Sequence, residues 1–120
     1  MIKRILLAED DAAVAYIIEN RLAHLNVEVM VADTGALALE HLRSGKRFDL
    51  IISDIVMPKI DGLELRTQIM DDEKLREIPF IFMTGHLAQA TKAQMLGPYL
   101  VLTKPVDSDD LSKIIENILF

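Results

Sequence analysis

The centre of the sequence contains the run Phe48-Asp49-Leu50-Ile51-Ile52-Ser53-Asp54, a short apolar segment that ends at an acid. Its apolar residues follow one another instead of alternating with polar ones, which is typical of a parallel strand covered on both faces. Similar runs of strand length occur at residues 5–8, 27–31, 80–83 and 100–102. The sequence therefore predicts a buried parallel sheet.

The segments between these runs have the apolar spacing of amphipathic helices. Glycines and prolines lie at or near the ends of the expected elements, Gly62 and Pro98 among them. Parallel strands that alternate with helices are joined by right-handed crossovers, which place helices on both faces of the sheet. We therefore expect a single α/β domain over residues 1–120, with five strand–helix units wound on both sides of one sheet.

Acidic residues stand where several of these helices should begin. Asp11 precedes the first helical segment, Asp107 precedes the last, and Asp61 is followed three residues later by Glu64. Carboxylates at such positions accept hydrogen bonds from the free amides of the first turn. These residues are predicted to be helix caps.

Composition narrows the classes of function. Apolar residues make up 51% of the chain, and 13 basic residues face 19 acidic ones, a net charge of −6. This balance predicts a folded domain that does not bind nucleic acid directly. The absence of cysteine and of any long apolar stretch favours a cytoplasmic protein without a membrane span. The methionines, Met83 and Met95 among them, are expected to fill the core.

Polar residues that can bind ligands or take part in a reaction follow the predicted strands. Glu9 and Asp10 follow the first strand, Asp54 ends the third, Thr84 ends the fourth and Lys104 follows the fifth. Because the carboxyl ends of parallel strands line one edge of an open sheet, these side chains should meet in one site.

Three carboxylates in one place repel one another unless a cation joins them. A hard divalent cation with oxygen ligands is the usual solution, and Mg²⁺ keeps several waters beside few protein ligands. We expect Asp10 and Asp54 to bind Mg²⁺ directly and Glu9 to act mostly through a bound water. Lys104 can then neutralise a phosphoryl oxygen and Thr84 can donate a hydrogen bond to another, with Asp54 as the nucleophile.

Taken in order, the motifs of this chain resemble those of the response-regulator receiver family, the chemotaxis-regulator type included. Each motif is weak alone, whereas the full set at these spacings is specific and spans the whole chain. The motifs are Ile5-Leu6-Leu7-Ala8-Glu9-Asp10-Asp11, Phe48 to Asp54, Met57-Pro58 with Asp61-Gly62, Ile78-Pro79 with Met83-Thr84, and Leu102-Thr103-Lys104-Pro105.

This resemblance implies a flavodoxin-like fold of strand order 2-1-3-4-5 and a role in two-component signalling. The phosphoryl group on Asp54 would come from a sensor histidine kinase or a phosphotransfer protein, in a reaction that depends on Mg²⁺. The backbone carbonyl of Val56 would be a further metal ligand, and the peptide before Pro105 would be cis. The chain would control a downstream protein or an output domain, as a monomer or as a dimer formed on phosphorylation, and would not be an enzyme beyond its own phosphorylation and dephosphorylation.

The chain also departs from the family pattern near its last strand. Many members have an aromatic residue three positions before the lysine, where this chain has Val101, and Tyr99 lies two residues earlier. Gly85 follows the threonine where alanine is common, and residues 98–100 replace a more polar approach to the strand. An altered signalling face is expected there.

Other functions remain open at this point. A phosphohydrolase that works through an aspartyl phosphate could use the same nucleophile, metal and lysine, but such enzymes commonly have an acid at the position of Val56. A pseudo-receiver would bind partners without phosphorylation. A nucleotide-binding protein is disfavoured because no glycine-rich phosphate loop follows the first strand. His24 and His41 share no spacing with other ligand residues and are interpreted as structural, whereas His86 is placed to flank the phosphoryl group.

Overall fold

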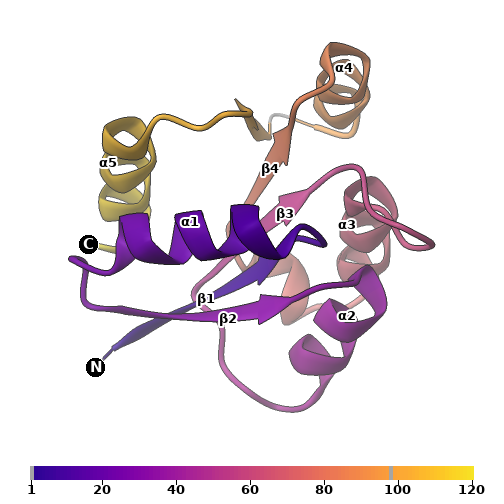
Figure 1. Ribbon diagram of the computed structural model, residues 1–120. Helices are drawn as coiled ribbons and strands as arrows, with labels where there is room; N and C mark the ends of the chain where they lie inside the picture. The colour runs from indigo at the N-terminus through magenta and orange to yellow at the C-terminus, as the bar shows by residue number, and fades with distance from the viewer. Residues whose placement is uncertain (1, 98) are drawn as a thin grey trace.

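The computed structural model describes residues 2–97 and 99–120, and strands alternate with helices along them (Figure 1). The strands are β1 (Lys3–Ala8), β2 (Val27–Ala32), β3 (Leu50–Asp54), β4 (Phe80–Thr84) and β5 (Leu100–Thr103). The helices are α1 (Ala12–Leu22), α2 (Gly35–Arg43), α3 (Gly62–Met70), the short 3-10 helix η1 (Leu75–Glu77), α4 (Leu87–Met95) and α5 (Ser108–Leu119). Among the described residues, no helix combines the length and apolarity that crossing a membrane requires. Pro98, expected near an element end, lies outside the described residues.

The strands form one parallel sheet of order β2-β1-β3-β4-β5, which confirms the predicted fold. In the register, Ala8 is paired with Ser53 and Asp54 with Met83, so the carboxyl ends of the central strands are nearly level. The strand order reverses between β1 and β3, because β2 lies beyond β1 and β4 lies beyond β3. The loops that follow β1 and β3 therefore diverge and leave a crevice at the carboxyl edge.

Helices cover both faces of this sheet, as Figure 1 shows. Helices α2, α3 and α4 pack over one face, onto strand side chains such as Ile51 and Phe82. Helices α1 and α5 pack over the other, onto Ile52 and Met83. Successive residues of a strand point to opposite faces, so a strand without polar gaps supplies both cores at once. This double burial explains the continuous apolar runs of the sequence.

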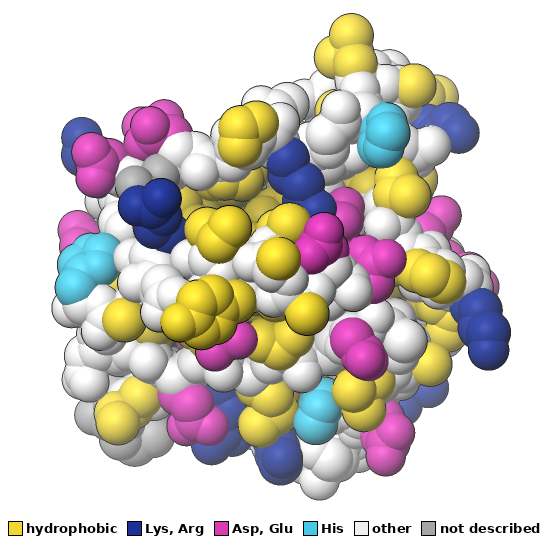
Figure 2. Space-filling view, viewed as in Figure 1, with side chains coloured by type: hydrophobic (Ala, Val, Ile, Leu, Met, Phe, Trp, Pro, Cys, Tyr) yellow, Lys and Arg dark blue, Asp and Glu magenta, His cyan; other side chains and the backbone are white. Residues whose placement is uncertain are grey.

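Two expectations about burial are wrong at the β5 edge of the molecule. Strand β5 pairs only with β4, and its residues are half-buried or exposed, with Leu100 43% exposed. Met83 is buried as expected, but Met95 at the end of α4 is 81% exposed. Hydrophobic side chains project from the surface over α4 in Figure 2. An edge strand and a helix with few buried residues leave this corner of the molecule lightly packed.

The predicted caps are confirmed. The Asp11 carboxylate accepts hydrogen bonds from the first-turn amides of α1, and the Asp107 carboxylate does the same for α5. Asp61 accepts a hydrogen bond of 2.8 Å from the amide of Glu64. These bonds satisfy amides that have no partner within the helix, and they set where α1, α3 and α5 begin.

The loop from β3 to α3 folds back tightly against the end of β3. The Gly62 amide donates a hydrogen bond of 2.8 Å to the Ile55 carbonyl. A Cβ at position 62 would lie 2.3 Å from the carbonyl oxygen of Asp54, closer than any real contact of this kind. Only glycine permits this approach. The first residue of α3 is therefore packed directly against the backbone that carries Asp54.

Candidate functional site

The polar residues predicted at the strand ends meet in one cleft at the carboxyl edge of the sheet. The cleft has a volume of about 280 Å³. It is lined by Glu9, Asp10, Asp11, Asp54, Val56, Gly85, His86 and Lys104. Thr84, at the end of β4, is fully buried and precedes the lining residue Gly85. The loops after β1, β3 and β4 and the segment after β5 thus each contribute to one site.

Three carboxylates form the acidic side of the cleft. One oxygen each from Glu9, Asp10 and Asp54 lies within 4.8 Å of the others. Glu9 and Asp54 are buried, with 1% and 6% of their surface exposed, and Asp10 is exposed. This donor set consists only of oxygen and opens to water on the Asp10 side, which suits a divalent cation that keeps part of its hydration shell. The residues present therefore fit Mg²⁺.

Lys104 joins two of these acids. Its Nζ donates hydrogen bonds of 2.5 Å to Glu9 Oε1 and 2.6 Å to Asp54 Oδ2. Burial alone would lower the pKa of Lys104, but its hydrogen bonds to Asp54 and Glu9 outweigh burial and raise that pKa above its ordinary value. The ammonium group is thus held in its charged form beside Asp54. The peptide bond between Lys104 and Pro105 is cis, as the resemblance implied.

Glu9 is the most strongly perturbed acid of the cleft. Burial raises its pKa from 4.5 to about 7, the hydrogen bond from Lys104 opposes this shift, and the negative charge of Asp54 adds to it. The amide of Asp11 also donates a hydrogen bond of 3.3 Å to Glu9 Oε2. Sequence analysis assigned Asp11 only a capping role, and its amide contact with Glu9 was missed because it depends on the shape of the turn.

The stability of the metal-free protein should therefore depend on Glu9. Because the pKa of Glu9 in the folded protein is raised above 4.5, its stabilising contribution is complete below that pH and disappears as the pH rises through about 7. The free energy of unfolding should fall by about 2 to 3 kcal/mol between about pH 5 and about pH 8. Urea unfolding with a chelator present would measure this change.

Two variants test whether Glu9 is its cause. Glu9→Gln should flatten the dependence of the unfolding free energy on pH, and Glu19→Gln, on the exposed side of α1, should leave that dependence unchanged. A native protein whose stability rises with pH would contradict the raised pKa of Glu9.

Thr84 is the last residue of β4, and Val56 follows the end of β3 by two residues. The Thr84 hydroxyl oxygen accepts a hydrogen bond of 3.1 Å from the His86 amide, which leaves the hydroxyl hydrogen free to be donated into the cleft. The Val56 amide donates a hydrogen bond of 3.3 Å to Asp54 Oδ1, and the Val56 side chain is 46% exposed. Metal binding by the Val56 carbonyl stays a prediction.

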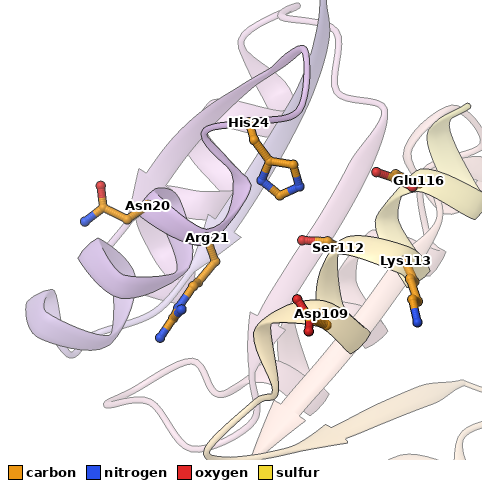
Figure 3. A pocket seen from close by; sticks show the side chains of 7 residues that line it. All are labelled: Asn20, Arg21, His24, Asp109, Ser112, Lys113 and Glu116. Atoms are coloured by element: carbon orange, nitrogen blue, oxygen red, sulfur yellow. The ribbon is translucent and has the colours of Figure 1, made fainter.

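A larger hollow of about 510 Å³ lies elsewhere, between α1 and α5 (Figure 3). Its lining mixes acidic, basic and neutral polar side chains, namely Asn20, Arg21, His24, Asp109, Ser112, Lys113 and Glu116. The sequence singled out none of these for chemistry, and His24 was interpreted as structural. The converging carboxylates, the lysine and the threonine are all at the strand ends instead, so the smaller cleft is the candidate site.

Known proteins share both this fold and this arrangement of motifs. The family model for the response regulator receiver domain matches residues 5–116. The response regulator receiver protein CpdR of Brucella abortus is 36% identical over 119 residues, which cover 98% of this chain and 97% of that protein. A probable transcriptional regulator of Porphyra purpurea, ycf29, is 36% identical over 118 residues, and the match covers 97% of this chain but 56% of the relative. The chain therefore spans about half the length of that relative.

Solved structures agree. The receiver domain of the sensor histidine kinase PA1611 of Pseudomonas aeruginosa, with a magnesium ion coordinated in its active site cleft, superposes with a TM-score of 0.86. It is 27% identical, and the match covers 98% of this chain and 97% of that domain. Since the family match runs from β1 into α5 and takes in every strand end that lines the cleft, this chain belongs to the response regulator receiver domains of two-component signalling.

Proposed function

We propose that this chain accepts a phosphoryl group on Asp54 in a Mg²⁺-dependent reaction and changes conformation as a result. The observation that carries the proposal is the position of Asp54, which ends β3 beside Lys104 and within reach of the Glu9 and Asp10 carboxylates. A structural acid would need one partner to balance its charge. Asp54 instead lines a cleft together with two further acids and a lysine that contacts both Asp54 and Glu9.

Mg²⁺, when bound, would neutralise the carboxylates and polarise the incoming phosphoryl group. Asp10 and Asp54 would hold it directly, with the Val56 carbonyl as a further ligand and Glu9 acting through water. The structure of the Pseudomonas aeruginosa relative, with its coordinated magnesium ion, supports this assignment.

In the transfer step, one Asp54 carboxylate oxygen attacks the phosphorus atom of a phosphohistidine on a sensor kinase or phosphotransfer protein. The new O–P bond forms as the N–P bond of the donor breaks, and the electron pair leaves with the imidazole nitrogen. Lys104 already lies 2.6 Å from Asp54 Oδ2, so a small movement of its Nζ would bring it to a phosphoryl oxygen. The free hydroxyl hydrogen of Thr84 would bind another of these oxygens.

The new charge would then shift the population of two packing arrangements. Thr84 is followed directly by Gly85 and His86, which lead into α4, so an inward movement of Thr84 would pull on this loop. The face formed by α4, β5 and α5 is lightly packed at α4 and β5, and a partner protein or output domain would recognise its altered form. Residues 1–120 would act as one receiver domain in this scheme.

Two other functions use the same residues. A phosphohydrolase would need an acid or base to guide water to the phosphoaspartate, and the exposed, apolar Val56 offers neither. A pseudo-receiver would have no use for three clustered carboxylates, Glu9, Asp10 and Asp54, and a lysine that contacts two of them. Both observations favour the phosphoacceptor.

The test is incubation with acetyl phosphate, with Mg²⁺ or with a chelator, followed by intact mass measurement. The native chain should gain one phosphoryl group with Mg²⁺ and none when the metal is chelated, because the clustered carboxylates repel the anionic donor without it. Denatured protein in the same mixture controls for unspecific acylation or phosphorylation. Absence of uptake under every condition would favour the pseudo-receiver and refute the proposal.

A further inference from the structure

A buried arginine lies outside the phosphoryl site. Arg66, in the middle of α3, is 7% exposed, whereas the other buried ionisable residues, Glu9 and Asp54, belong to the cleft. Within residues 2–97 and 99–120, no carboxylate forms an ion pair with Arg66. Taking an arginine out of water without an acid requires other groups to replace its hydration.

Tyr99 and Phe80 take the place of much of the water around the Arg66 guanidinium. The Arg66 guanidinium lies over both rings, 4.9 Å from the centroid of Tyr99 and 5.4 Å from that of Phe80. Its Nε donates a hydrogen bond of 2.8 Å to the Tyr99 hydroxyl oxygen, and one Nη donates a longer bond of 3.5 Å to the Arg76 carbonyl. Cation–π contacts withdrawn from water and hydrogen bonds to a charged group are among the stronger non-covalent interactions in a protein.

Tyr99 also contacts residues other than Arg66, in α3 and in β4. Its hydroxyl also donates to Met70 Sδ at 3.9 Å, so both partners of the hydroxyl belong to α3. The ring meets Phe82 of β4 edge to face, with centroids 5.4 Å apart. Tyr99 directly precedes β5, and α3 and α4 lie on the same side of the sheet in Figure 1. The tyrosine therefore ties the start of β5 to α3 and β4.

Gly97, just after α4, lies close to the same ring. Gly97, two residues beyond α4, has φ of +153°, and a Cβ there would lie 3.3 Å from the Tyr99 ring. At the other end of α4, the side chain of the N-cap residue His86 makes no capping hydrogen bond, and Leu87 and Met95 on this helix are 82% and 81% exposed. Its buried residues are the small Ala90 and Ala93, so packing on the sheet contributes little to holding α4 in place.

We propose that Arg66 and Tyr99 form a clamp that holds the start of β5 against α3 and so sets how easily α4 and β5 move. The first part of this inference is independent of phosphorylation. The second part, that the clamp resists the change which phosphorylation of Asp54 induces, rests on the proposed function. Arg66 and Tyr99 are positioning residues here, since neither touches the phosphoryl site.

Hydrogen exchange of the unphosphorylated protein tests the clamp itself. Tyr99→Phe and Arg66→Met should each speed amide exchange in α4 and β5 by about tenfold, since each removes a partly buried hydrogen bond to a charged group. Exchange in β1 and β2 should not change. Tyr16→Phe, at an exposed tyrosine of α1, and Arg76→Met, which leaves the Arg76 carbonyl in place, are the matched controls. Unchanged exchange in α4 and β5, or equal acceleration in every strand, would overturn the proposal.

The double variant shows whether the two residues act as one unit. Arg66→Met with Tyr99→Phe should exchange little faster than Arg66→Met alone, because the hydrogen bond that Tyr99→Phe removes is already lost with Arg66. Additive effects would mean that the residues act separately. Arg66→Lys should resemble Arg66→Met, since lysine keeps the charge but lacks the planar group and the Nε donor; full rescue by lysine would contradict stacking as the basis.

A final comparison adds acetyl phosphate and Mg²⁺. In the native chain, phosphorylation should speed exchange in α4 and β5, and Tyr99→Phe should show part of this change before phosphorylation. Suppose that the native chain gains a phosphoryl group, and that α4 and β5 exchange at the same rates in the native chain and in Tyr99→Phe. The clamp then has no part in switching. If the native chain gains none, the proposed function fails, while the unphosphorylated exchange rates still decide whether the clamp exists.

Discussion

Asp54→Asn is expected to take up no phosphoryl group from acetyl phosphate under conditions in which the native chain is modified. The amide lacks the anionic oxygen that attacks phosphorus, and it is a poorer ligand for Mg²⁺ than the carboxylate. The fold should survive, because Lys104 keeps its hydrogen bond of 2.5 Å to Glu9 when Asp54 is neutralised. Intact mass and circular dichroism of both proteins would measure these two properties.

Asp61→Asn is the matched control for this substitution. Asp61 belongs to the same loop region but caps α3 through the Glu64 amide and does not line the cleft. Asparagine caps helices about as well as aspartate, so this variant should be phosphorylated like the native chain. Uptake by Asp54→Asn equal to that of Asp61→Asn would place the phosphoryl group on another residue and remove the main support for the mechanism.

Gly62→Ala should destabilise the protein by about 3 kcal/mol or more, because overpacking against immobile atoms is relieved only by moving backbone. The added Cβ would lie 2.3 Å from the Asp54 carbonyl oxygen and 2.9 Å from the Ile55 Cα. Neither atom belongs to a flexible side chain. Either α3 must shift outward or the end of β3 must move, and the second response would displace Asp54 from Lys104. Urea unfolding should show the loss, and phosphorylation of the remaining folded protein should be slower.

Gly85→Ala separates this effect from a general intolerance of alanine near the site. A Cβ at position 85 would be 3.9 Å from Lys104 Cβ, which is an ordinary contact distance. Its free energy of unfolding should stay within about 0.5 kcal/mol of the native value. Similar losses at positions 62 and 85 would show that the close approach at Gly62 is not the cause.

Much of the fold was predictable because its causes are local. Continuous apolar runs such as Leu50 to Ser53 follow from burial on both faces, and the cap at Asp61 needs only its own carboxylate and the amide three residues on. The meeting of Asp54 with Lys104 was also predictable, because strand direction alone brings all carboxyl ends to one edge. Parallel topology thus brings together residues that are far apart in the sequence.

Burial at the edges of the molecule was less predictable. Leu100 is as apolar as the residues of β3, yet it is 43% exposed because β5 is the last strand of the sheet. Met95 is an apolar residue at the end of α4, but its side chain is exposed to solvent. Apolarity shows that a residue can be buried, and the position of its element decides whether it is.

The sequence by itself determined the order of the strands and main helices, the caps at Asp11, Asp61 and Asp107, and which residues gather at the strand ends. Periodicity, turn chemistry and strand direction act within or between whole elements and can therefore be read from the sequence. Tertiary structure alone decided the contact of Arg66 with Tyr99 and the approach of Gly62 to the Asp54 backbone. In the sequence Arg66 looks like a solvent-exposed arginine of α3, and its partner lies 33 residues away. Such contacts depend on how side chains fill the space between packed helices and strands. Small differences in the spacing of these elements decide whether an arginine side chain faces water or an aromatic ring.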